Sequence, residues 1–169
     1  MAVHIITDSA SDLSSNAHPR LTVLPLSVAF GDTVYRDGVD LDNNRFYEML
    51  VESDHLPTTG QVNPFAFSQA IGEVRDADPD AGIVIVTLSS KLSGTNQSAC
   101  IAALEADGEG AGVYVVDSLN ATVGEHVLVE RALQLADDGR TAPEIASELN
   151  RERRRVRLVA LLDTLEYLR

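Results

Sequence analysis

Short apolar runs of strand length recur along this chain, and segments with helical periodicity separate them. The runs cover residues 3–6, 83–88, 113–116 and 156–162. The run at 83–88 is continuous, as is typical of a strand that is covered on both faces. Strands that alternate with helices predict an α/β fold, with a mainly parallel, doubly wound sheet, right-handed crossovers and helices on both faces.

Helix-start signals mark several of the segments between these runs. Asp42 or Asn43 can cap the first expected helix, and Thr141 with Glu144 forms a capping box that has proline in its first turn. Helices are expected over residues 43–51, from 63 onward, over 92–104, over 121–136 and from 141 onward.

The region between residues 21 and 61 fits this alternation less well. Residues 21–28 form an extended segment that Pro25 interrupts, and Gly31 with Asp32 indicates a turn, so we expect an edge strand or a hairpin here. Residues 56–61 are polar and lack periodicity, and we expect them to form a loop between packed helices.

Length, charge and cysteine content limit the class of protein. The 169 residues fit one domain with its own core. A formal net charge of −13 disfavours nucleic acid as a partner, because Lys and Arg supply the affinity for phosphate backbones. The lone Cys100 cannot form an internal disulfide, which indicates a reducing cytoplasm. We see no leader and no apolar run near the ~20 residues that span a bilayer, so we expect a cytoplasmic protein without a membrane anchor.

Loops rich in hydroxyl groups follow three of the predicted strands, at residues 7–9, 89–95 and 117–120. Ligands of parallel α/β sheets bind beyond the carboxyl ends of the strands, so these loops are expected to gather at one edge. Ser93, Gly94 and Thr95 open a predicted helix, whose free N–H groups attract an anion. The alternative is that Ser93 only caps this helix, as such residues usually do.

Other chemistries find less support in the sequence. Neither G-x-x-x-x-G-K-[ST] nor G-x-G-x-x-G is present, and there is no G-x-S-x-G nucleophile elbow. The acidic pairs Asp8 with Asp12 and Asp40 with Asp42 lack the pattern of a calcium loop, so we expect no metal. A small hydrolase or transferase that uses Ser93 as its nucleophile stays open as an alternative function.

Five segments distributed over the whole chain resemble the DegV family, and they occur in the same order as in that family. They are residues 5–13 (IITDSASDL), 57–61 (PTTGQ), 89–99 (SSKLSGTNQSA), 115–118 (VVDS) and 162–168 (LDTLEYL). Members of this family are fatty-acid-binding proteins. In some bacteria they are the binding subunit of fatty acid kinase and present the acyl carboxylate to a separate kinase subunit.

The resemblance implies a role for particular residues of this chain. Ser93 and Thr59 would hydrogen-bond the carboxylate of a long-chain fatty acid, and Gly94 and Thr95 would shape the same site. Further loop contributors would be Thr7, Asp8, Ser9, Gln61 and Ser118. The protein would then be a binding subunit without a cofactor, and the phosphoryl transfer would belong to its kinase partner.

The chain departs from the family in two respects. Gly60 stands where members commonly have Ser, and the family's second α/β domain, which adds an arginine and a histidine to the site, is absent. We therefore expect residues 1–160 to form the N-terminal domain and residues 161–169 to start the handover to the second one. We also expect weak or absent fatty acid binding by this chain alone, and a homodimer through the face that the second domain would cover.

Overall fold

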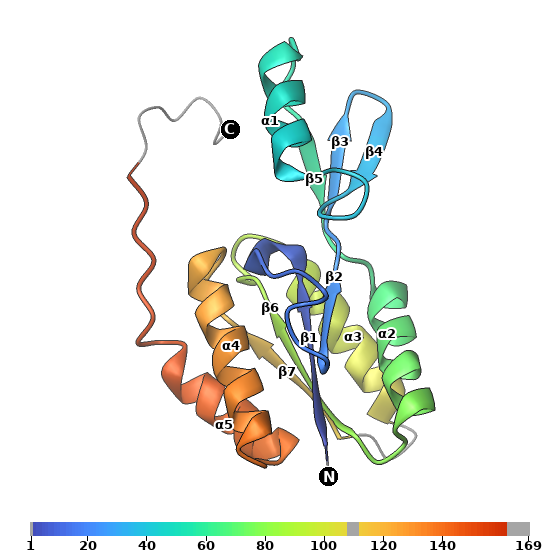
Figure 1. The fold of residues 1–169 in the computed structure, drawn as a ribbon, viewed down its shortest axis with the longest axis vertical. Coiled ribbons are helices and arrows are strands. Elements are labelled where there is room, and N and C mark those ends of the chain that lie inside the picture. Colours follow the sequence, from blue (N-terminus) through green and yellow to red (C-terminus); the bar gives the residue numbers. More distant parts are fainter. Residues whose placement is uncertain (1, 108–111, 162–169) are drawn as a thin grey trace.

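A four-stranded parallel sheet forms the centre of the larger part of the molecule, and a smaller lobe rises beyond one end of it (Figure 1). The computed structural model describes residues 2–107 and 112–161. The sheet has the order β2-β1-β6-β7, and all neighbouring strands are parallel. Its strands are β1 (Val3–Asp8), β2 (Leu21–Leu24), β6 (Gly82–Thr87) and β7 (Val113–Asp117).

Burial on both faces accounts for the continuous apolar runs in the sequences of the two central strands, β1 and β6. All six residues of β6 are buried, and β1 lies beside it with Ile5 opposite Val84. Because helices cover both faces of these strands, apolar side chains on either face enter a core and no polar alternation is required. The parallel α/β fold predicted from the sequence is confirmed.

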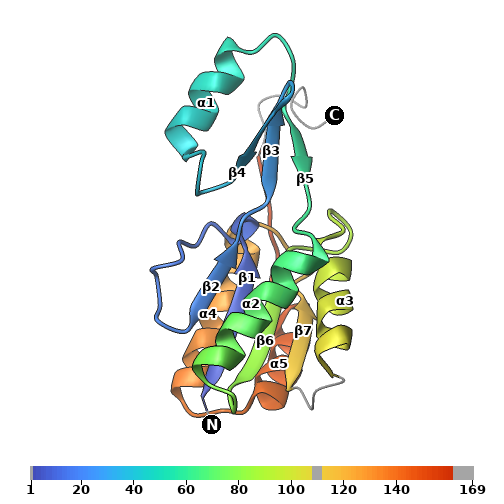
Figure 2. The same ribbon diagram turned by 90° about the vertical axis from the view of Figure 1, so that its right-hand side faces the viewer.

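Two pairs of helices cover the two faces of the sheet (Figure 2). On one face Phe67 of the first pair shares a hydrophobic cluster with Ile85, and on the other face Leu149 of the second pair clusters with Val84. The first pair is α2 (Pro64–Ala77) and α3 (Thr95–Asp107), and the second is α4 (Val123–Asp137) and α5 (Ala142–Glu152). The capping box of Thr141 and Glu144 is present at the start of α5, as predicted.

The smaller lobe contains a three-stranded antiparallel sheet and one helix (Figures 1 and 2). These elements are β3 (Ser27–Phe30), β4 (Thr33–Arg36), α1 (Asn43–Glu52) and β5 (Thr58–Gly60), and the strand order is β4-β3-β5. Pro25 lies between β2 and β3, so the extended segment predicted there divides between two sheets. Phe30 packs edge-on against Phe46 of α1, with ring centroids 5.9 Å apart.

The expectation of a loop at residues 56–61 was wrong for its central part. Residues 58–60 form β5 and pair with β3, with Thr59 opposite Val28. The two flanking helices are not packed on each other, because α1 belongs to the lobe and α2 to the body (Figure 2). A three-residue strand with exposed threonines carries no apolar alternation, so only its distant partner reveals it.

The strand predicted at residues 156–162 was also wrong for the part that the structure describes, residues 156–161. These residues are irregular and run beside α4, on the side away from the sheet (Figure 1). Val159 is 89% exposed and Leu161 is 99% exposed, because no described strand pairs with them. Residues 162–169, and with them most of the expected handover segment, lie outside the described residues.

Candidate functional site

The carboxyl ends of β1, β6 and β7 lie side by side, and hydrogen bonds join the loops that follow them. Asp8 at the end of β1 accepts a bond from the Leu88 amide, with 2.9 Å between Oδ2 and N. The Ser89 amide donates to the carbonyl oxygen of Asn120 across 2.7 Å. The Ser90 hydroxyl donates to Asp117 Oδ2 across 2.6 Å. The expected gathering of the three polar loops at one edge is confirmed.

Ser93 lies at the entrance to α3 and performs the capping role that the sequence left open. Its Oγ accepts a hydrogen bond from the Thr95 amide at 3.2 Å and lies 2.9 Å from Thr95 Oγ1. Thr95 is fully buried, whereas Ser93 is half-buried. Because a hydroxyl offers one donor and two acceptor positions, the cap leaves Ser93 with capacity for a further bond on its accessible side.

The side chain of Gln61 lies against Gly94. A Cβ atom at position 94 would stand 1.9 Å from Gln61 Oε1. The Gln61 amide group donates to Ser98 Oγ at 3.0 Å, and the backbone amide of Val62 donates to Thr95 Oγ1 at 3.3 Å. The segment that leaves β5 is therefore bonded to the first turn of α3, and the structure brings Gln61, Gly94 and Thr95 together.

Thr59 lies on β5, two residues before Gln61, and its side chain is exposed. The neighbouring Gly60 faces Ser27 across the β3–β5 ladder. A Cβ atom at position 60 would lie 2.3 Å from Ser27 Oγ, so this strand pair already holds a hydroxyl where a serine at 60 would have to fit. A serine at position 60 would therefore require the Ser27 hydroxyl to turn away.

The remaining loop residues named from the sequence form internal hydrogen bonds. Ser9 donates to Asp37 Oδ2 at 2.7 Å, and Ser118 donates to the carbonyl oxygen of Asn120 at 3.0 Å. Thr7 is fully buried and donates to a glutamate of α4. These three hydroxyls hold loops and elements together, which is the ordinary work of such residues near turns.

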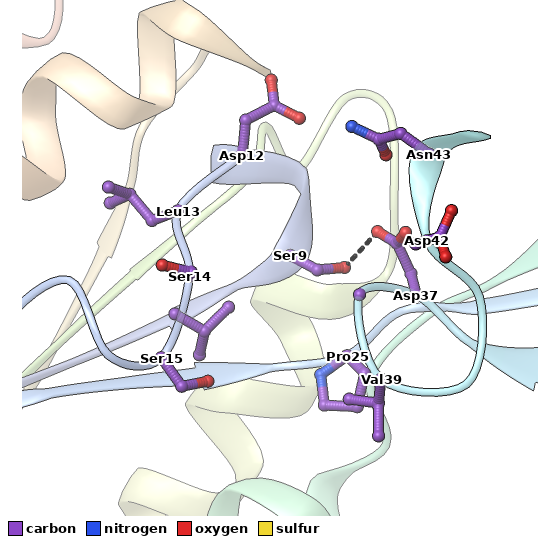
Figure 3. Close-up of a pocket in the computed structure, with 12 residues that line it drawn as sticks. Ser9, Asp12, Leu13, Ser14, Ser15, Pro25, Asp37, Val39, Asp42 and Asn43 are labelled. Atoms are coloured by element: carbon purple, nitrogen blue, oxygen red, sulfur yellow. Dashed lines mark hydrogen bonds between the residues drawn. The ribbon is translucent and has the colours of Figure 1, made fainter. Parts of the chain in front are cut away.

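A cavity of about 320 Å³ opens between the loop after β1 and the lobe (Figure 3). Acidic side chains dominate its polar lining, namely those of Asp12, Asp37 and Asp42. The Ser9 hydroxyl bonds to Asp37 at its wall, and neither Ser93 nor Thr59 lines it. Because negative charges repel a carboxylate, this cavity does not suit the head group of a fatty acid.

Two carboxyl groups are fully buried at this edge of the sheet, and only Asp8 was named from the sequence. Burial raises the pKa of Asp8 to about 6, although two backbone amides oppose the shift. Burial, followed by the negative charge of nearby Asp8, raises the pKa of Glu125 to about 10. The signal that could have identified Glu125 is an acidic residue on the apolar face of a helical segment, three positions before Leu128.

The described residues offer little for metal or nucleophilic chemistry. They contain no group of three or more His, Cys, Asp or Glu side chains that could hold a metal ion. Within the same ranges, the Ser93 hydroxyl bonds to Thr95 and not to a histidine or carboxylate base, which nucleophilic catalysis requires. No helix in the described part is long and apolar enough to cross a membrane.

Comparison with known proteins finds DegV family members both among sequence relatives and among solved structures. A DegV domain-containing protein of Clostridium perfringens is 31% identical over 169 residues, which cover 98% of this chain and 59% of the relative. The structure of a DegV family protein from Thermus thermophilus, described as fatty acid binding, matches with a TM-score of 0.78 and 34% identity, covering 91% of this chain and 54% of that one. A stearic-acid-binding protein from Eubacterium ventriosum matches with a TM-score of 0.76 and 29% identity, covering 88% of this chain and 52% of that one.

The chain thus spans little more than half the length of the curated relatives it matches. A family model described as "Uncharacterised protein, DegV family" matches residues 2–169. The match extends over both the sheet and the lobe, and it includes every loop at the carboxyl edge. The chain belongs to the DegV family.

Proposed function

We propose that this protein binds a long-chain fatty acid and that Ser93 and Thr59 hydrogen-bond its carboxylate, with Gly94 and Thr95 shaping the site. The observation that carries the proposal is the half-buried Ser93 hydroxyl at the first turn of α3, beside the segment that leaves β5. The N–H groups of this turn favour an anion without any lysine. The fatty-acid-binding structures from Thermus thermophilus and Eubacterium ventriosum, which share this fold, support the same ligand.

The bound carboxylate would accept hydrogen bonds from two hydroxyl groups, those of Ser93 and Thr59. The Ser93 hydroxyl can rotate its proton toward the ligand while its oxygen still accepts the Thr95 amide. Thr59 is exposed on β5, two residues before Gln61, and its hydroxyl would be the second donor. For the head group to approach Gly94 closely, the Gln61 side chain would have to turn away from Ser98.

In this proposal the protein is a binding subunit and carries out no phosphoryl transfer itself. Its partner would be a cytoplasmic fatty acid kinase subunit that receives the exposed carboxylate. The support is the ordered match of five sequence segments to the family, together with a Ser93 that has no base beside it in the described part of the chain. The expected homodimer stays a prediction.

The test replaces Ser93 by Ala and measures the affinity of the protein for stearate. Ser90→Ala is the matched control, because Ser90 lies in the same loop but directs its hydroxyl to Asp117. We expect Ser93→Ala to lower the affinity at least tenfold, which is about 1.4 kcal/mol. The free energy of unfolding should fall by only about 1 kcal/mol for the lost cap.

Two results would contradict the proposal. Equal stearate affinity in the Ser93→Ala and Ser90→Ala proteins would remove the carboxylate role from Ser93. Covalent labelling of Ser93 by a serine-directed phosphonate probe would favour the hydrolase or transferase alternative instead. Mass spectrometry of the lipid extracted from native protein gives an independent measurement of whether a fatty acid is bound at all.

A further inference from the structure

Glu125 is a buried carboxyl group that the proposed ligand site does not use. It lies in the first turn of α4 and has no exposed surface. Its Oε1 accepts a hydrogen bond from the Thr7 hydroxyl of β1 at 3.2 Å. Its Oε2 is buried and has no hydrogen-bond partner among the residues that the structure describes. A bare negative charge in such a position is costly, because burial removes hydration and nothing replaces it.

The charged groups that shift the pKa of Glu125 are acidic. Asp8 of β1 is fully buried, and Asp12 after the first turn and Asp117 at the end of β7 add further negative charge. The strand β6, which also packs against α4, carries no titratable side chain. Helix α5 meets α4 through Ala and aliphatic residues and through an ion pair between Arg131 of α4 and Glu152, which are 3.3 Å apart. Arg153, which follows the last residue of α5, donates to the carbonyl oxygen of Asp117 at 2.6 Å.

Asp8 and Glu125 differ in the hydrogen bonds that their carboxyl groups accept. Asp8 accepts backbone hydrogen bonds from Ala10 at 3.1 Å and from Leu88 at 2.9 Å, so its negative charge is compensated. Glu125 has the single bond from Thr7. Of two like-charged neighbours in a buried site, the less compensated one keeps its proton. At neutral pH the pair therefore carries one charge on Asp8 and one proton on Glu125, in line with pKa values of about 6 and about 10.

We propose that Glu125 is a positioning residue that keeps its proton in the folded chain, and that this proton lets charged Asp8 hold the Leu88 amide at the start of the Ser93 loop. The Leu88 amide belongs to the residue directly before Ser89, and the carbonyl oxygen of Ser89 accepts from the Ser93 amide at 3.2 Å. A second charge beside Asp8 would weaken this anchor. The inference holds whether or not the protein binds a fatty acid.

The proton has a measurable consequence for stability. The unfolded chain releases the Glu125 proton near its ordinary pKa of 4.5, whereas the folded chain keeps it up to about 10. Between these values the folded state binds one more proton than the unfolded state, so stability is lost as the pH rises. One proton corresponds to a tenfold fall in the folding equilibrium constant for each pH unit. Asp8 adds a similar effect only below its folded pKa of about 6. Burial also raises the pKa of the Cys100 thiol from its ordinary value of 9.0, which adds a loss of stability near pH 9 in wild type and variant alike. The difference between the two proteins from about pH 7 to pH 9 therefore isolates Glu125.

The experiment compares urea unfolding of the wild-type chain and Glu125→Gln between pH 7 and pH 9. The amide is neutral at every pH, so we expect the variant to lack the tenfold loss per pH unit that the wild type shows. Glu130→Gln is the matched control, because Glu130 lies on the same helix but is 63% exposed, and it should keep the wild-type slope. If Glu125→Gln does not fold, Glu125→Leu, which is also neutral and of similar size, replaces it.

Two further measurements separate a positioning role from simple packing. The infrared difference spectrum of wild type minus Glu125→Gln at pH 7 should contain the carbonyl band of a protonated carboxylic acid. The Leu88 amide should exchange its hydrogen faster in the wild type than in Glu125→Gln as the pH approaches 10. Parallel pH profiles for the two proteins, or the absence of the carboxylic acid band, would overturn the proposal. Equal exchange at Leu88 would overturn the link to the Ser93 loop.

Discussion

Replacing Gly94 by Ala tests whether the glycine at the candidate site exists to admit the Gln61 side chain. The new Cβ atom would stand 1.9 Å from Gln61 Oε1 and 2.8 Å from its Cδ. Gln61 is exposed and can turn away, but it would then lose its 3.0 Å hydrogen bond to Ser98, which is buried. The loss of such a bond costs about 0.5–1.5 kcal/mol. We expect Gly94→Ala to lower the free energy of unfolding by about this amount.

A double-mutant cycle measured by urea unfolding isolates this contact. In a Gln61→Ala background the same Gly94→Ala change meets no side chain, so its cost should fall close to zero and the coupling energy should be about 0.5–1.5 kcal/mol. Gly72→Ala is the matched control, because a Cβ atom at this position in α2 would have nothing within 4 Å. It should stabilise the chain by up to about 1 kcal/mol, the helix propensity of Ala over Gly. An equal cost of Gly94→Ala in both backgrounds would refute the steric reasoning.

Two further predictions concern the core and the end of the described chain. Phe67→Ala should lower the free energy of unfolding by about 3–5 kcal/mol in urea titrations, because this ring is fully buried between α2 and the sheet. A loss below about 1 kcal/mol would contradict the packing described for this face. Val159→Asp should change the free energy of unfolding by less than about 0.5 kcal/mol, because the side chain is 89% exposed. A large loss would mean that residues 156–161 pack as the sequence suggested.

The sequence predicted the body of the fold well because its two central strands, β1 and β6, are buried on both faces. The apolar run at 83–88 needs burial on both faces, which a central strand provides, and β6 is such a strand. The run at 156–162 has a similar composition but lacks a strand to pair with in the described structure, and pairing is a long-range property that a local pattern does not contain. The same reason explains why β5 was missed, since its partner β3 lies about thirty residues away in the chain.

The candidate site was predictable in its position but less so in its contacts. Parallel strands place their following loops at one edge, so the gathering of the hydroxyl-rich loops followed from topology. The contact between Gln61 and Gly94 did not, because it joins the lobe segment to α3 and depends on how the lobe meets the body. Glu125 was overlooked because acidic side chains on helices are usually solvated. Its burial comes from β1 and the first turn of α4, which only the folded structure brings together.

The polar groups at the carboxyl edge also fasten the lobe to the body, and this affects how any variant there is interpreted. The chain crosses between the two parts before β3 and after β5. At the first crossing the Leu26 amide donates to Ser9 Oγ at 3.1 Å, and at the second the Val62 amide donates to Thr95 Oγ1 at 3.3 Å. Removing either hydroxyl would therefore disturb the lobe and the ligand site together. In the described part of the chain, Ser93 bonds to Ser89 and Thr95 within its own loop and turn, so its removal separates ligand contact from lobe position most cleanly.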